Sequence, residues 1–137
     1  MKREIKFRVW DHNTDTMMIP DNFEFCDGKI CWIDAGREAG PKSGNDGDPG
    51  QFEIMQYVGL HDKNGRSIYE GDIIVTHPKM KYEIPKIGVV QYGDCRPMFQ
   101  YKSGDGEEYS IWSNNVYRTY EVIGNIFENP ELLEGKQ

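Results

Sequence analysis

The sequence predicts a mainly β protein built from many short strands. Glycine (15) and proline (7) supply 22 of the 137 residues, which leaves few windows long enough for a helix. Short β-prone runs lie between these turn residues, as in residues 56–75, QYVGLHDKNGRSIYEGDIIV. There Asn64-Gly65 predicts a type I′ hairpin turn, and Gly71-Asp72 bends the chain into an apolar run at 73–75. Repeated strands of this length are typical of a small barrel or sandwich.

Alternating apolar residues predict a half-buried strand at residues 4–10, with Ile5, Phe7 and Val9 on one face. A polar turn follows this strand, and residues 17–19 return as a short partner. The two segments therefore predict an antiparallel pair at the start of the chain.

A second hairpin is predicted around Asp27-Gly28, a dipeptide that suits a two-residue type I′ turn. In that register Phe25 faces Ile30, and Phe23 faces Trp32 on the same side of the hairpin. The apolar residues then share one face, which supports the hairpin.

Residues 34–50 contain five glycines and two prolines and almost nothing apolar, which is typical of a flexible excursion or linker. This segment is the best candidate for a boundary within the chain. Further short strands, each bounded by turn residues, are predicted at residues 52–58, 87–92, 98–101, 109–112 and 119–127. A short C-terminal helix is predicted from Asn129-Pro130 onward, with its leucines docked on the sheet.

The net charge of −7 gives no general attraction toward nucleic acid. The basic residues are more commonly explained as dispersed, solvated surface charges, and the alternative is that some of them form a small basic patch. Its residues are Lys2, Arg3, Lys6, Arg8, Lys79, Lys81 and Lys86. No apolar run approaches the roughly 18 residues of a membrane span, and no apolar segment follows the basic start, so we expect a soluble cytoplasmic protein. An odd number of cysteines (Cys26, Cys31 and Cys95) predicts reduced thiols in that compartment.

Three blocks of the sequence carry a family resemblance: REIKFRVWD at 3–11, QYVGLHDKNGRSIYEGDII at 56–74 and YEVIGNIFENPELL at 120–133. Together they resemble the YopX-like family of phage and prophage proteins. The resemblance implies a small N-terminal β region at 1–50, an SH3-like barrel at 51–137 and action inside a bacterial host cell. It implies no activity and no functional residues.

No catalytic, cofactor-binding or metal-ligating residue is assigned from the sequence, and no cofactor is expected. The spacing of Asp11, Asn13 and Asp15 matches the start of a calcium loop. However, Thr16 and Asn22 stand where such a loop requires glycine and glutamate, so an Asx-rich turn is favoured. Similarly, a Glu70 and Asp72 pair is better explained by capping of nearby backbone N–H groups.

These observations favour a non-enzymatic module that binds a host or phage protein, or a second copy of itself, through aromatic and edge-strand surfaces. Nucleic-acid binding through the basic patch is the alternative. A third hypothesis is a ribonuclease, because the Gly-Asp-Ile-Ile-Val segment also resembles the barrel entry of MazF-type toxins. That hypothesis assigns chemistry to Arg96, Arg118, Thr76 or Thr119, but fold analogy is a weak basis for activity.

Overall fold

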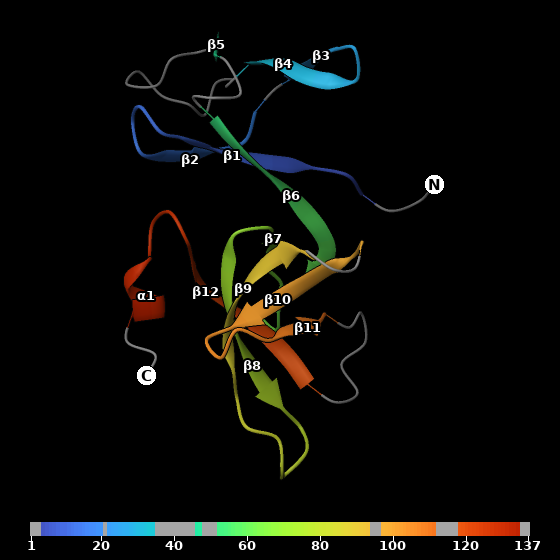
Figure 1. Ribbon diagram of the computed structural model, residues 1–137, viewed down its shortest axis with the longest axis vertical. Helices are drawn as coiled ribbons and strands as arrows, with labels where there is room; N and C mark the ends of the chain where they lie inside the picture. The colour runs from blue at the N-terminus through green and yellow to red at the C-terminus, as the bar shows by residue number, and fades with distance from the viewer. Residues whose placement is uncertain are drawn as a thin grey trace. The chain divides into compact units, whose positions relative to one another are not determined.

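The computed structural model describes residues 4–20, 22–34, 46–47, 52–93, 97–111 and 118–134. Strands predominate in these ranges, and a single short helix lies near the C-terminus (Figure 1). The prediction of a mainly β protein with a short C-terminal helical segment is therefore confirmed. The described residues fall into two compact units, 4–56 and the residues from 57 onward. The predicted domain boundary after residue 50 stays a prediction.

The first unit contains two small antiparallel sheets. Its strands are β1 (Phe7–Asp11), β2 (Thr16–Met18), β3 (Asn22–Cys26), β4 (Lys29–Asp34), β5 (Asp46–Gly47) and the first part of β6 (Phe52–His61). Strand β1 pairs with β2 and with β6, whereas β4 pairs with β3 and β5. The core of this unit consists of Val9, Met18, Ile33 and Phe52, each at most 3% exposed.

The hairpin between β3 and β4 forms as predicted, except that the pairing of its strands shifts by one residue. Asp27 and Gly28 have φ of 51° and 80°, which confirms the type I′ turn, and Phe25 pairs with Ile30 as predicted. The predicted pairing of Phe23 with Trp32 is wrong, because a bulge shifts the register and Phe23 faces Ile33. The shift lets Phe23 pack on the fully buried Ile33 within the core.

The second unit is built on a five-stranded antiparallel sheet in the order β11-β10-β9-β8-β12, which curls on itself (Figure 1). Its elements are β7 (Ser67–Tyr69), β8 (Asp72–Pro78), β9 (Ile87–Tyr92), β10 (Phe99–Ser103), β11 (Glu108–Ser110), β12 (Arg118–Asn125) and α1 (Glu131–Glu134). The second part of β6 pairs with β7. Ile68, Ile74, Val90, Tyr101 and Tyr120 form the core.

The turn between β6 and β7 is not the predicted type I′ turn, because positive φ is found at Gly65 (86°) but not at Asn64. The five residues from Asp62 to Arg66 form a longer loop, closed by the Asp62 N–H donating to the Arg66 carbonyl at 2.7 Å. The Asp62 carboxylate accepts from the N–H groups of Asn64 (2.9 Å) and Arg66 (2.8 Å). These bonds stabilise the longer loop over the two-residue turn.

Carboxylates cap backbone groups at two further turns, as the sequence predicted. The buried Asp11 accepts from the Asn13 N–H at 2.9 Å in the β1–β2 turn, which confirms the Asx interpretation. Asp72 accepts from the Tyr69 N–H at 2.8 Å. Leu133 of α1 and Ile87 of β9 line the same hollow. The predicted docking of both leucines on the sheet stays a prediction.

The prediction that all three cysteines are reduced is wrong for Cys26, which is disulfide-bonded. The side chains of Cys31 and Cys95 lie outside the described part of the chain. No helix in the described ranges is long and apolar enough to span a membrane.

Candidate functional site

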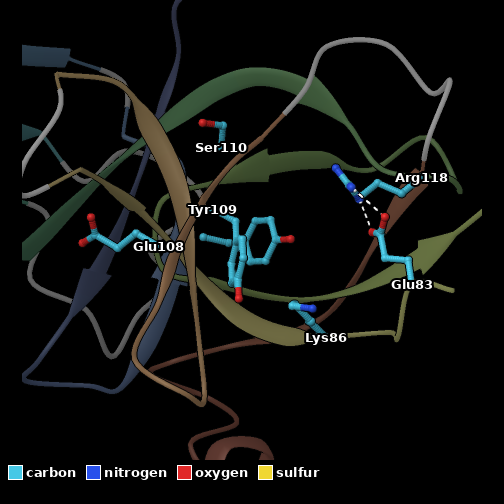
Figure 2. A pocket seen from close by; sticks show the side chains of 7 residues that line it. Glu83, Lys86, Glu108, Tyr109, Ser110 and Arg118 are labelled. Atoms are coloured by element: carbon cyan, nitrogen blue, oxygen red, sulfur yellow. Dashed lines mark hydrogen bonds and ion pairs between the residues drawn. The ribbon is translucent and has the colours of Figure 1, made fainter.

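A pocket of about 370 Å³ opens on the five-stranded sheet of the second unit. Its lining comes from β10, β11, β12 and residues 79–86, which we name the β8–β9 connection. The residues around it are Glu83, Lys86, Tyr101, Glu108, Tyr109, Ser110 and Arg118 (Figure 2). The volume lies at the lower end of the range for ligand pockets, which begins at roughly 300 Å³. The pocket therefore has room for a small molecule or for one or two residues of a peptide.

The β8–β9 connection is fixed to β8 by two hydrogen bonds at its C-terminal end. The Lys86 N–H donates to Thr76 Oγ1 at 2.8 Å, and the Thr76 N–H donates to the Lys86 carbonyl at 2.9 Å. Thr76 is 1% exposed, so its hydroxyl holds the connection in place. This arrangement leaves Thr76 unsuited to the catalytic role assigned to it in the ribonuclease hypothesis.

A bidentate ion pair joins the connection to β12 across the pocket (Figure 2). Arg118 donates from Nε to Glu83 Oε2 at 2.6 Å and from Nη2 to Oε1 at 2.9 Å. The hydrogen bond from Arg118 lowers the pKa of Glu83, and the same bond raises the pKa of Arg118. Both groups therefore stay charged and paired at neutral pH, and the charge of Arg118 is largely compensated.

Aromatic rings form the inner wall of the pocket. Tyr101 stacks on Tyr109 with centroids 5.3 Å apart, and Tyr120 meets Tyr101 edge-on at 6.0 Å. Burial raises the pKa of Tyr101 to about 12. Partial desolvation and the nearby Asp105, which accepts from the Tyr109 hydroxyl at 3.3 Å, also raise the pKa of Tyr109. Both phenols therefore keep their protons at neutral pH.

Three polar groups of the pocket have no hydrogen-bond or ion-pair partner among the described residues: Lys86 Nζ, the Tyr101 hydroxyl and the Ser110 hydroxyl. Lys86 Nζ lies 5.3 Å from the centroid of the Tyr109 ring, in a cation–π contact. By contrast, both carboxylates of the pocket accept hydrogen bonds, Glu83 from Arg118 and Glu108 from Gln91 Nε2 at 2.9 Å. The groups left over in the pocket are thus one ammonium and two hydroxyls, and each hydroxyl can donate or accept a hydrogen bond.

Large apolar side chains project from the β8–β9 connection into solvent. Met80 is 52% exposed, Tyr82 93% and Ile84 73%, and the exposed Lys79 and Lys81 alternate with them along the chain. We name Met80, Tyr82 and Ile84 the apolar tip. Its signal in the sequence is the alternation of lysine and apolar residues in KMKYEIPK, where the lysines alone suggest only a source of positive charge.

The predicted basic patch is divided between parts of the structure. Lys2 and Arg3 lie outside the described residues, and Lys6 and Arg8 belong to the first unit. The remaining three lysines lie on the β8–β9 connection, where Lys79 and Lys81 are exposed and Lys86 turns into the pocket. Nothing in the structure joins the seven residues into one surface, so the patch as a whole stays a prediction.

Of the residues named in the ribonuclease hypothesis, Arg118 alone lines the pocket, while Arg96 lies outside the described residues. Thr119 is half-buried in β12, opposite His77. Sequence reasoning missed Glu83, Tyr101 and Tyr109 as members of one site. Nor do three or more His, Cys, Asp or Glu side chains gather as metal ligands in the described ranges.

The fold and the pocket define a small β protein with a curled five-stranded sheet that carries an aromatic pocket. Residues 6–134 match the family described as YopX protein, and the chain belongs to this family, as its sequence blocks predicted. No curated protein matches the chain.

Solved structures with this fold include two proteins that are similar to this chain. Protein EF1440 from Enterococcus faecalis is 31% identical, with a TM-score of 0.68 over 96% of this chain and 99% of the other. Protein yopX from Bacillus subtilis is 21% identical, with a TM-score of 0.63 over 93% of this chain and 96% of the other. Both therefore resemble this protein along nearly its whole length.

Proposed function

We propose that this protein is a non-enzymatic protein-interaction module of phage or prophage origin that acts in the cytoplasm of a bacterial host. In this proposal the curled sheet of the second unit serves as an SH3-like barrel scaffold. The apolar tip on the β8–β9 connection is the contact surface, and its exposure is the observation that carries the proposal.

The apolar tip is suited to a protein partner because it combines exposure with a fixed backbone. Single exposed apolar residues are common on protein surfaces, whereas three on one connection offer a partner more apolar area to bury. The hydrogen bond that Thr76 Oγ1 accepts from the Lys86 N–H and the Glu83–Arg118 ion pair hold the connection in place. A connection that is ordered before binding loses less conformational entropy when a partner docks.

The chemistry of the pocket favours binding over catalysis. A general base needs a pKa near the working pH, whereas Glu83 is held ionised in an ion pair and Tyr101 is held protonated. Arg118, the cation that the ribonuclease hypothesis would use, is already neutralised by Glu83. These groups bind and orient more readily than they transfer protons.

Nucleic-acid binding is the second candidate, supported by Tyr82 beside Lys81 on the same connection. A highly exposed ring can stack on a base while a neighbouring lysine contacts phosphate. The net charge of −7 opposes this function.

The test places a photo-crosslinking amino acid at position 82 of the full-length chain in the bacterial host. We expect a crosslinked protein of defined mass, and we expect the combined changes Met80→Ser and Ile84→Ser to lower its yield at least about tenfold, as for hot-spot residues. The fold should survive because these side chains are exposed. Crosslinking at Tyr92, which is 50% exposed on β9, serves as the matched control and should not give this product.

Three outcomes would contradict the proposal. Position 82 could give no product, the same products could form at position 92, or the product could disappear on nuclease treatment. The last result would instead support the nucleic-acid candidate. Crosslinking between two copies of this chain, with a dimer by light scattering, would identify the partner as the protein itself.

A further inference from the structure

We propose that the apolar tip, Met80, Tyr82 and Ile84, binds an acidic segment of a partner protein. This inference rests on the proposed function, because it specifies the chemistry of the protein that the tip contacts. Apolar side chains of the partner cover the tip, and its carboxylates pair with Lys79 and Lys81, which alternate with the apolar residues along the chain. The partner is therefore a segment in which acidic and apolar residues occur together.

The first support is the sign of the exposed charge beside the tip. Lys79 and Lys81 are both exposed, and neither has an ion-pair or hydrogen-bond partner in the part of the chain that the structure describes. The connection contains one acidic residue, Glu83, whose carboxylate is bound by Arg118 through Nε at 2.6 Å and through Nη2 at 2.9 Å. A partner that approaches the tip therefore meets two cations and no free carboxylate of the connection.

Lys86, the third lysine of the connection, does not belong to this exposed surface. It lines the pocket, where its charge interacts with those of Glu83 and Asp105. The attraction of an acidic partner to the tip therefore depends on Lys79 and Lys81.

The second support is the position of the tip, because it limits the effect of the net charge of −7. The β8–β9 connection projects from the five-stranded sheet of the second unit (Figure 1). At physiological ionic strength, exposed charges farther apart than about 8 Å are largely screened from one another. The charges beside the tip therefore have the largest effect on an approaching partner, and these charges are positive. They attract an acidic protein surface and repel a basic one.

The third support is the kind of side chain that the connection presents. Tyrosine and methionine are enriched in protein interfaces, whereas lysine is depleted and the rim of an interface is polar. Tyr82 is 93% exposed, so nearly its whole ring is available to a partner. In such an interface the tip forms the apolar centre, and Lys79 and Lys81 lie at the rim. Charge pairs at a rim contribute mainly to the association rate and to specificity.

A membrane and a nucleic acid also carry negative charge, but both fit the connection less well than a protein does. Basic segments that bind anionic membranes typically contain about four to eight lysines and arginines, whereas two are exposed beside the tip. A base can stack on the ring of Tyr82, but phosphate and sugar offer no apolar surface to cover Met80 and Ile84. An acidic protein segment supplies both carboxylates for the lysines and apolar side chains for the tip.

The test uses the full-length chain in the bacterial host, with the photo-crosslinking amino acid at position 82. Mass spectrometry of the crosslinked product should identify a partner peptide with a net negative charge. The combined changes Lys79→Glu and Lys81→Glu should lower the yield of this product at least about tenfold, because like charges then face each other. The combined changes Lys79→Arg and Lys81→Arg keep both charges and should leave the yield unchanged.

The combined changes Lys63→Glu and Lys102→Glu provide the matched control. Both lysines are exposed and lie outside the connection, so these changes alter the net charge by the same amount without changing the surroundings of the tip. The yield at position 82 should not fall in this control. Circular dichroism of each variant reports whether the fold is retained. Lys79→Gln with Lys81→Gln removes the two charges without reversing them and should give an intermediate yield.

The results separate this inference from the proposed function. The absence of any protein product at position 82, or crosslinking to lipid or nucleic acid in place of protein, would contradict both. A product that survives the charge reversal, or a partner peptide that is neutral or basic, would overturn the acidic partner and leave the tip as a contact surface. An equal loss in the control with Lys63 and Lys102 changed would also overturn the inference, since the net charge of the protein would then explain the effect.

Discussion

Replacing Asp62 with alanine should lower the free energy of unfolding by about 3 kcal/mol, because it removes three hydrogen bonds to a carboxylate at once. One carboxylate oxygen accepts from Asn64 and Arg66 within the β6–β7 loop. The other oxygen accepts from the Val122 N–H of β12 at 2.9 Å, across 60 residues of sequence. Asp62 is 7% exposed, so water replaces these bonds only in part. Urea unfolding followed by circular dichroism measures the effect.

Asp62→Asn separates the local role of this side chain from the long-range one. An asparagine oxygen can still accept from the two loop N–H groups, but its amide would turn a donor toward the Val122 N–H. We therefore expect the free energy of unfolding of Asp62→Asn to lie between those of the wild type and of the alanine variant. Equal stability of all three proteins would show that the cross-link to β12 does not contribute to folding.

The contribution of Asp62 should disappear in acid. Partial burial alone would raise its pKa, but the bonds from Val122, Arg66 and Asn64 outweigh burial, and the pKa lies below the usual 3.8. A lowered pKa in the folded state gives stability that is present above the unfolded pKa and lost as the pH falls through the folded value. The difference between wild type and Asp62→Asn should therefore be constant from about pH 5 to 8 and shrink below about pH 4.

This difference isolates Asp62 from other carboxylates that titrate in the same window, such as Glu83 and Asp105, whose pKa values are also lowered. Those groups are present in both proteins and cancel in the subtraction. A stability difference that stayed the same down to pH 2 would contradict the assignment.

Gly88→Ala should destabilise the protein by about 2–3 kcal/mol through overpacking. A Cβ at position 88 would lie 2.8 Å from the Lys102 carbonyl oxygen and 3.0 Å from Tyr101 Cδ2. The carbonyl belongs to the neighbouring strand β10, so it cannot retreat without stretching the ladder between β9 and β10. Thermal unfolding should show a lower Tm, by on the order of 10 °C.

The same substitution should disturb the pocket, because the Tyr101 ring occupies the space beside Gly88. Near-ultraviolet circular dichroism of the tyrosines reports this change in the folded state. Gly106→Ala is the control: nothing lies within 4 Å of an added Cβ there, and the cost comes only from its φ of 86°, about 1–2 kcal/mol. A Gly88→Ala protein as stable as wild type would mean that the two strands separate more easily than the backbone pairing implies.

The two type I′ turn predictions had different outcomes for a physical reason. At Asp27-Gly28 the flanking strands close directly on the dipeptide, so local backbone preference decides the turn. At Asn64-Gly65 the same kind of dipeptide is overruled by Asp62, whose carboxylate organises five residues and also reaches β12. A contact with a residue so distant in sequence has no local signature.

The site was harder to predict than the fold for the same reason. Arg118 was considered in the sequence as an isolated cation, whereas its partner Glu83 lies 35 residues away. Thr76 was considered for its hydroxyl, which the structure commits to the backbone of Lys86. Lys86 itself was grouped with Lys79 and Lys81 because the three are close in sequence, but only Lys86 lines the pocket.

The sequence by itself determined the short-stranded β architecture, the C-terminal helical turn and the family, since glycine, proline and alternating apolar residues act locally and recur in a recognisable order. Tertiary structure alone decided which side chains meet. Strand pairing brings Tyr101, Tyr109 and Arg118 together from three strands and adds Lys86 and Glu83 from the connection between two others. Charge compensation and burial in that setting fix which groups remain free to bind a ligand, and these effects arise only once the sheet has closed.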